Sequence, residues 1–229
     1  MRPALCIIVP VLDEADTLVP RLRALQGFRK RGARLVVVDG GSQDDTLALA
    51  RTHADLALLA PRGRASQMNA GAAACPADVL LFVHADTELP DNADLLVRRA
   101  TMGAVAWGRF DVHIASSRPL LRLVAGMMNR RSRWTGIATG DQALFVRHEL
   151  FRSVGGFPDL PLMEDIAISR LLKRQGPPAC LTEQVTTSAR RWERHGVWRT
   201  ILLMWRLRVA YFLGADPKQL AIRYGYRPR

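Results

Sequence analysis

The chain is poor in cysteine and carries no close cysteine pair. Its three cysteines, Cys6, Cys75 and Cys180, lie far apart in the sequence. An odd number of widely spaced cysteines does not fit a disulfide framework, and none of the spacings is that of a zinc site. We therefore expect no disulfide framework, and a reducing compartment, the cytoplasm.

Long apolar runs and an N-terminal secretory signal are also missing. The first apolar run stops at Pro10 and becomes acidic at Asp13 and Glu14, unlike a signal peptide. Residues 196–214 are apolar but too short and too charged to cross a bilayer. Their two tryptophans and nearby arginines leave open a peripheral contact with an anionic membrane at its inner face. Packing of this segment against the rest of the protein explains its apolar residues equally well.

Acidic residues are fewer than basic ones, 21 against 33, so the formal net charge is +12. The excess is greatest in residues 190–229, which hold nine arginines and one lysine against two acidic residues. A segment of this kind favours an anionic partner. The chain has no helix-turn-helix, zinc-finger spacing or RNA-binding aromatic motif, so we expect no nucleic-acid partner.

Strand and helix patterns alternate along the first half of the chain. Four repeats of this kind predict a doubly wound, mainly parallel sheet, with strands at 5–11, 34–38, 55–59 and 78–83. The pattern is looser beyond residue 103, where we expect strands at 104–114 and 142–146 and helices at 120–128 and 164–174. The predicted organisation is one domain, 1–195, with halves 1–103 and 104–195, followed by a basic helix and tail, 196–229.

Carboxylates follow three of the expected strands. Glu14 follows the first strand, Asp39 follows the second, and Asp86 comes after the apolar run 79–83. Parallel strands share an edge at their carboxyl ends, which is where open α/β sheets bind ligands, so these side chains should converge. Their oxygens suit a divalent cation. Taken singly, each residue is also explained as a helix cap or a turn former.

Taken in order, a set of short motifs resembles those of family 2 glycosyltransferases. The motifs are Ile8–Glu14, Val38–Thr46, His84–Thr87, Gly140–Gln142, Gly155–Phe157 and Met163–Asp165. The resemblance implies the α/β GT-A fold, a Rossmann-like nucleotide-diphospho-sugar transferase with a mainly parallel sheet flanked by helices and a C-terminal helical appendage. Two groups of bacterial glycosyltransferases resemble the chain more closely, one associated with arsenosugar biosynthesis and one with glycosylation of carotenoid acids. Residues 186–192 and the short chain are more similar to the first group.

The resemblance implies a donor site in the nucleotide-binding half, 1–103, made of Pro10, Leu12, Glu14, Asp39, Arg64 and Asp86. The first three border the nucleotide, Asp39 accepts a hydrogen bond from the base, and Arg64 lies over base or phosphate. Asp86 is the metal ligand, holding Mg²⁺ or Mn²⁺ on the diphosphate of a UDP-sugar or GDP-sugar. The family often has Asp where this chain has His84, which we interpret as a hydrogen-bonded structural histidine rather than a ligand.

The acceptor half, 104–195, is implied to hold Gly140, Asp141, Gln142, Glu164, Arg191 and Trp192 at the acceptor. By the same resemblance Asp165 is the catalytic base, which takes the proton of the acceptor as it attacks the anomeric carbon. The neighbouring Glu164 would favour this role through like-charge repulsion. The alternative is that both residues only complement the dipole of the helix that they begin.

These residues predict an inverting glycosyltransferase, because one direct displacement inverts the anomeric centre. The chain has Ser188 where processive members have Gln of a Gln-x-x-Arg-Trp motif, so we expect transfer of one sugar to a small-molecule or lipid-linked acceptor. One alternative is a non-catalytic protein that binds nucleotide sugars or lipids. A second is a sugar-phosphate nucleotidyltransferase, which should have a glycine-rich loop after the first strand; residues 10–14 contain no glycine.

Overall fold

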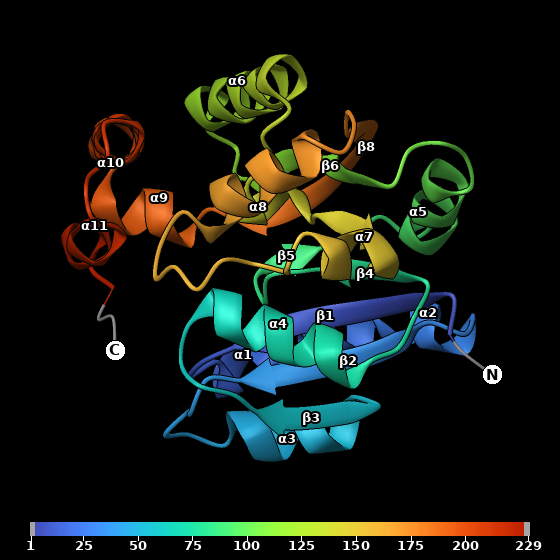
Figure 1. Cartoon of the computed structure of the whole chain (residues 1–229). Coiled ribbons are helices and arrows are strands. Elements are labelled where there is room, and N and C mark those ends of the chain that lie inside the picture. The colour runs from blue at the N-terminus through green and yellow to red at the C-terminus, as the bar shows by residue number, and fades with distance from the viewer. Residues whose placement is uncertain (1–2, 227–229) are drawn as a thin grey trace.

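Eight strands form one sheet in the computed structural model, which describes residues 3–226 (Figure 1). The strands lie in the order β3-β2-β1-β4-β7-β6-β8-β5. Their bounds are β1 Leu5–Val11, β2 Arg34–Asp39, β3 Leu56–Leu59, β4 Val79–Phe82, β5 Thr87–Glu88, β6 Trp107–Ala115, β7 Phe145–Arg147 and β8 Ala179–Ser188. Strands β1 to β4 pair in parallel, as do β6 and β8, whereas β7 and β5 run antiparallel to their neighbours. The expected mainly parallel α/β sheet is confirmed.

Helices cover both faces of this sheet (Figure 1). In the first half they are α1 Ala15–Ala24, α2 Gln26–Lys30, α3 Thr46–His53, α4 Arg64–Ala74 and α5 Ala93–Thr101. In the second half they are α6 Pro119–Thr135, the 3₁₀ turn η1 Gly140–Gln142, α7 His148–Ser153, α8 Glu164–Lys173, α9 Arg190–His195, α10 Val197–Phe212 and α11 Pro217–Tyr224.

The first strand shows why the sequence forms a layered sheet. Successive residues of β1 point to opposite faces. Ile7 packs with Leu18 and Leu22 of α1, whereas Ile8 belongs to the cluster that includes Met68 of α4. A strand covered on both faces must be apolar throughout, which is the pattern of residues 5–11.

Cys6 of β1 and Cys75 at the end of α4 form a disulfide, with their Cα atoms 6.5 Å apart, and Cys180 is free. The expectation of no disulfide is wrong. The two cysteines are 69 residues apart in the sequence. The strand–helix packing alone brings them together, so their spacing carried no signal. The cytoplasmic location, for which cysteine usage was one reason, stays a prediction.

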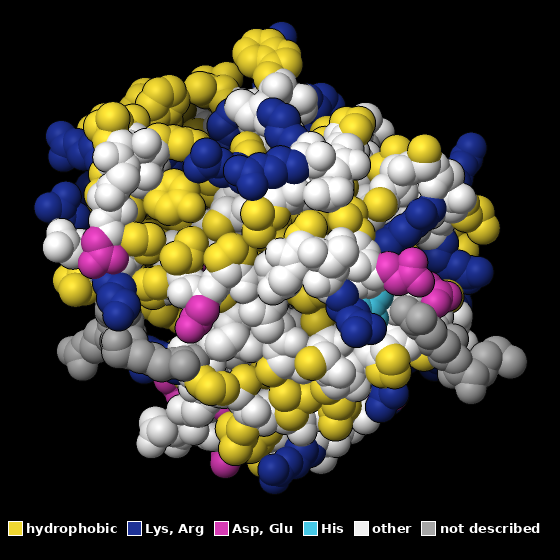
Figure 2. All heavy atoms as spheres, viewed as in Figure 1, with side chains coloured by type: hydrophobic (Ala, Val, Ile, Leu, Met, Phe, Trp, Pro, Cys, Tyr) yellow, Lys and Arg dark blue, Asp and Glu magenta, His cyan; other side chains and the backbone are white. Residues whose placement is uncertain are grey.

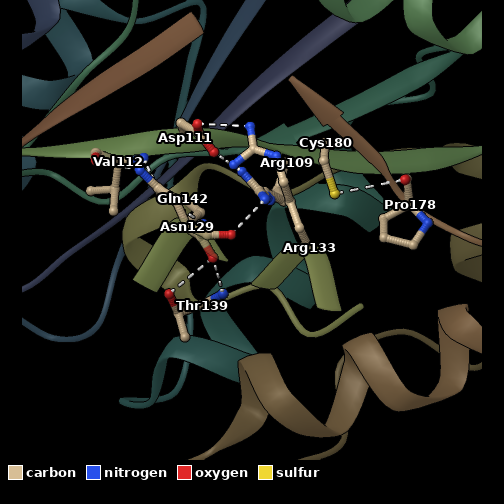
Figure 3. Close-up of polar contacts among 9 residues, drawn as sticks. All are labelled: Arg109, Asp111, Val112, Asn129, Arg133, Thr139, Gln142, Pro178 and Cys180. Atoms are coloured by element: carbon tan, nitrogen blue, oxygen red, sulfur yellow. Dashed lines mark hydrogen bonds and ion pairs between the residues drawn. The ribbon is translucent and has the colours of Figure 1, made fainter. Parts of the chain in front are cut away.

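A buried polar cluster holds α6 against β6 (Figure 3). Both amide atoms of Asn129 bond the backbone of Val112, at 2.9 and 3.0 Å. Arg109 is fully buried and paired with Asp111, which also binds Arg133 at 2.8 Å. The helix expected at 120–128 therefore continues to Thr135, because its polar last turns have partners on the sheet.

The C-terminal helices pack on the second half of the chain. Leu207 of α10 and Leu220 of α11 form a cluster with Met163 and Ile166, and Val197 packs in another with Leu121 of α6. No helix within residues 3–226 is both long and apolar enough to cross a membrane. The proposed division at residue 195 places these helices in a segment that contacts the domain through apolar side chains.

Two glycines in helices test the packing of the core. A Cβ on Gly71 in α4 would lie 2.5 Å from Cγ2 of Ile8, so Gly71→Ala should lower the free energy of unfolding by about 1–3 kcal/mol. Gly126 in α6 has nothing within 4 Å of that position, so Gly126→Ala should raise it by about 0.5–1 kcal/mol. Urea unfolding of both variants measures these shifts. Changes of the same sign would contradict the described packing of α4 on β1.

Candidate active site

The carboxyl ends of β2, β1 and β4 lie side by side. In the parallel register Val11 is opposite Asp39, and Ile8 is opposite Phe82. The segments that carry Glu14, Asp39 and Asp86 therefore leave the sheet at one edge, where a ligand of an open α/β sheet binds. Their roles toward a donor stay predictions.

Asp39 organises the loop that follows β2. Its carboxylate is fully buried. One oxygen accepts hydrogen bonds from the backbone N–H groups of Gly41 and Ser42 at 2.7 and 2.8 Å, and the other accepts from the Ser42 hydroxyl at 2.6 Å. In this structure the carboxylate shapes the loop. Its hydrogen bond to a nucleotide base stays a prediction.

Gln67 is a positioning residue that sequence reasoning missed. Its buried amide donates to the carbonyl oxygens of Val11 and Val38, both at 2.8 Å, and so links the ends of β1 and β2 to α4. A Cβ atom placed on Gly40 would lie 3.1 Å from this amide, so the glycine leaves room for it. The anchored helix carries Arg64 in its first turn. A single Gln within a helix gives no sequence signal of this role.

The remaining donor candidates lie around the same edge. Pro10 is buried in β1 and Leu12 is half-buried. The Glu14 carboxylate accepts a hydrogen bond from the Thr17 hydroxyl at 2.8 Å. Asp86 is half-buried in the turn between β4 and β5, and no group of three or more His, Cys, Asp or Glu side chains within residues 3–226 could hold a metal.

A pocket of about 540 Å³ brings the two halves of the chain together. Its polar lining includes Arg64 and His84 of the first half, Asp141, Glu164 and Asp165 of the second, and Tyr224 of the C-terminal segment. Gly140 and Trp192 also line it. The other predicted residues, which lie outside this lining, are Pro10, Leu12, Glu14, Asp39, Asp86, Gln142 and Arg191.

The turn η1 fits closely against His84, the second residue after β4. A Cβ on Gly140 would lie 2.2 Å from Cε1 of His84, so only glycine allows this contact. Nδ1 of His84 lies 3.7 Å from Oδ1 of Asp141. Burial works against ionisation of Asp141, but His84 and the charges of Arg64 and Arg191 outweigh it and hold the pKa of Asp141 below its ordinary value. His84 thus lies beside Asp141 and lines the pocket, and its structural role stays a prediction.

The candidate base and its neighbour begin helix α8. Oδ2 of Asp165 accepts a hydrogen bond from the Gly140 N–H at 3.0 Å. Glu164 is buried, and its Oε1 lies 3.6 Å from Nη1 of Arg64. Burial and the charge of Asp165 raise the pKa of Glu164 above its ordinary value, although Arg64 opposes them. The site therefore holds two adjacent carboxyl groups with different surroundings.

Helices α9 and α11 close one side of this polar region. The Arg191 guanidinium lies 3.6 Å from the ring centroid of Tyr224, and its Nη2 donates to the Tyr224 carbonyl at 3.1 Å. Burial raises the pKa of Tyr224. Sequence reasoning missed Tyr224, since one aromatic residue near the end of the chain carries no motif. Gln142 is also buried, where its side chain caps η1 through Thr139 at 3.2 Å.

The rest of the pocket is mainly an apolar wall, which sequence reasoning also missed. The polar residues in this part of the lining are Arg130, Arg131, Thr135, Thr139 and Arg208. Helix α6 contributes Val124, Met127, Met128 and Trp134, and α10 contributes Ile201, Met204 and Trp205. Both helices show an apolar face, but nothing in the sequence indicates that the two faces meet across one pocket.

An open α/β sheet with convergent loops at its carboxyl edge, and a second half that completes the pocket, is an arrangement that binds ligands at the strand ends. Residues 6–146 match glycosyl transferase family 2, and the chain belongs to this family. It is 30% identical over 118 residues to uncharacterized glycosyltransferases of Mycobacterium bovis and Mycobacterium tuberculosis. That match covers 45% of this chain and 52% of each relative, so it spans about half of their length.

Solved structures share the fold. The mannosyltransferase PcManGT from Pyrobaculum calidifontis, in complex with GDP-Man and Mn²⁺, is similar with a TM-score of 0.64 and 25% identity, over 100% of this chain and 66% of that one. Residues 1–349 of TarS from S. aureus, in complex with UDP-GlcNAc, have a TM-score of 0.67 and 18% identity, over 82% of this chain and 58% of that one. The GT-A fold is thereby confirmed.

The raised pKa of Glu164 makes a prediction about stability. The unfolded chain ionises this residue at a lower pH than the folded protein does, so its contribution to stability falls as pH rises from the ordinary pKa to the raised one. Glu164→Gln cannot ionise. The variant should therefore gain stability over the wild type at about pH 8 but not at about pH 4. Urea unfolding at both pH values measures the difference. Glu149→Gln, at an exposed first-turn position in α7, is the control; an equal gain there would contradict the explanation.

Proposed function

We propose that this glycosyltransferase is an inverting, metal-dependent and non-processive enzyme that moves one sugar from a UDP or GDP donor to an acceptor. One observation carries the proposal: Asp165 and Arg64, from opposite halves of the chain, line one pocket. A transferase of this kind needs a base at the acceptor and a cation at the leaving diphosphate.

In the proposed reaction Asp165 accepts the proton of an acceptor hydroxyl. The Gly140 N–H holds one of its oxygens, which fixes the orientation of the carboxylate. The carboxylates around Arg64 raise its pKa although burial opposes the charge, so it stays a cation beside the departing diphosphate. Attack from the side of Asp165, opposite the diphosphate, would invert the anomeric carbon.

The residues at the strand edge fit a metal ion that is shared with the donor. Asp86 is a single half-buried carboxylate, and residues 3–226 offer no complete protein cage. Mg²⁺ is commonly held by one or two carboxylates together with substrate phosphates. When bound, Mg²⁺ or Mn²⁺ would neutralise charge on the diphosphate. The similar structure of PcManGT contains Mn²⁺ and GDP-Man, which supports this assignment.

The other donor and acceptor assignments follow this arrangement. Pro10, Leu12 and Glu14 would border the nucleotide, and Asp39 would shape the loop at its base. Glycosyltransferase family membership argues against the nucleotidyltransferase alternative, and the base variant below tests the non-catalytic one. The sugar and the association with arsenosugar biosynthesis stay predictions.

Two variants separate donor binding from turnover. Asp86→Ala should abolish Mn²⁺-dependent binding of UDP or GDP, because it removes the carboxylate that shares the metal. Asp165→Asn should keep that binding but release nucleotide from UDP-sugars or GDP-sugars about 10²–10⁴-fold more slowly. Isothermal titration and nucleotide-release assays measure these effects, with Asp91→Asn, an exposed position, as control. Unchanged turnover in Asp165→Asn would overturn the assignment of the base.

A peripheral contact with anionic lipid is also part of the proposal. Helices α6 and α10 contain seven arginines, four and three, and no acidic residue. Hydrophobic side chains gather over the same region with Lys and Arg among them (Figure 2). The exposed ones are Leu123, Met127, Trp134, Trp198, Leu202, Trp205, Val209 and Phe212. Basic residues beside exposed tryptophans suit the surface of an anionic bilayer.

Vesicle co-sedimentation tests this contact. At low salt the protein should bind vesicles of phosphatidylglycerol but not those of phosphatidylcholine, because arginines supply much of the attraction. Trp198→Glu should reduce the binding, whereas Leu59→Glu, on the distant strand β3, should not. Equal binding by all three proteins, or none by the wild type, would exclude the proposed surface.

A further inference from the structure

Arg131 of α6 is a half-buried cation with two buried N–H groups that have no hydrogen-bond partner within residues 3–226. It lines the pocket, and its Nε and Nη2 are buried without a hydrogen-bond partner in the described part of the chain. A buried N–H group without a partner costs about 1–3 kcal/mol, more when charged. Burial lowers the pKa of Arg131, although Asp165 and Asp141 act in the opposite direction. The guanidinium therefore has donors available for an anion in the pocket.

The apolar wall continues from this guanidinium to the surface. Met128 and Met204 line the pocket from α6 and α10. Met127, Trp134 and Trp205 line it too, and their side chains are exposed at 53%, 81% and 61%. The pocket thus has a polar end at Asp165 and an apolar end open to solvent. Methionine side chains adapt to flexible apolar ligands.

We propose that the acceptor is an amphiphile with an anionic head group, held by Arg131, and one alkyl chain that packs between α6 and α10. This inference rests on the proposed function, because it assigns the acceptor of the same site. The head group is a phosphate or a carboxylate, since both accept the donors of a guanidinium. A neutral polar acceptor would leave Arg131 unpaired and the apolar wall wet.

The position of Arg131 relative to Asp165 determines which acceptor atom reacts. Since the anion is bound at Arg131, a hydroxyl near the head group faces Asp165. In the transfer this hydroxyl oxygen bonds to the anomeric carbon, the bond from that carbon to the diphosphate breaks with its electron pair on the diphosphate, and the hydroxyl proton goes to Asp165. No further reactant is required.

Binding of simple amphiphiles tests the proposal without a transfer assay. Isothermal titration uses octyl, decyl and dodecyl phosphate, dodecanoate and neutral dodecyl maltoside, each below its micelle concentration. The wild type should bind the phosphates or dodecanoate, about fourfold more tightly for each added methylene. The stronger of the two anions identifies the head group. Equal affinity for the anionic and neutral amphiphiles, or no dependence on chain length, would overturn the proposal.

Three variants assign the two ends of the ligand. Arg131→Gln should weaken binding of the dodecyl anions at least tenfold and leave binding of dodecyl maltoside unaffected. The variant should melt no lower than the wild type, because Nε and Nη2 of the arginine have no hydrogen-bond partner among the described residues. Met204→Gln should weaken the dependence on chain length. Arg122→Gln, an exposed position on α6 outside the pocket, is the matched control and should change neither. Equal anion affinity in Arg131→Gln and the wild type would overturn the role of Arg131.

A parallel titration with UDP or GDP and Mn²⁺ separates this inference from the proposed function. If the protein bound nucleotide but no amphiphile, the proposed class of acceptor would be excluded and the proposed donor site would stand. If it bound amphiphiles but no nucleotide, the proposed binding of an amphiphile in the pocket would be supported and the proposed donor would be excluded. The proposal would also be overturned if the protein bound no amphiphile but formed a dimer that Trp205→Glu dissociates. The apolar wall would then be the contact surface for a second copy of the chain.

Discussion

The close contact between Gly140 and His84 is the constraint on which the pocket depends. It brings the turn η1 against the end of β4, at a distance that any side chain at residue 140 would prevent. The Gly140 N–H binds Asp165, and the next residue, Asp141, lies beside His84. One residue without a side chain thus joins the strand edge of the nucleotide-binding half to the helix that carries the candidate base.

Charged side chains of opposite sign lie around this contact, and their pairing explains why charged groups can be buried there. Arg64 enters from α4, where Gln67 anchors the helix to β1 and β2, and it faces Glu164. The carboxylates raise the pKa of Arg64, while burial raises the pKa of Glu164. Buried charges without partners are costly, so the cation and the carboxylates depend on one another. A charged leaving group entering the pocket would meet a cation that is already in place.

The same pocket changes character toward α6 and α10. Apolar side chains of α6 and α10 line the open end of the pocket. The arginines of these two helices have no acidic residue on either helix as a partner. Asn129 and the Arg109–Asp111 pair hold α6 on the sheet, so its apolar face is free for the pocket. The polar cluster in Figure 3 therefore positions the apolar wall, and one of its members, Thr139, also lines the pocket.

Local patterns in the sequence were enough to predict β1 to β4 and to place Asp39 and Asp86 near the carboxyl ends of β2 and β4, because apolar runs and turn residues act over short distances. They were not enough for β8, whose polar residues 179–188 form a strand only because β6 lies beside them. Tertiary structure alone decided the Cys6–Cys75 pair, the partial burial of Arg131 and the meeting of α6 with α10. These features depend on contacts between segments far apart in the chain, which no local pattern records.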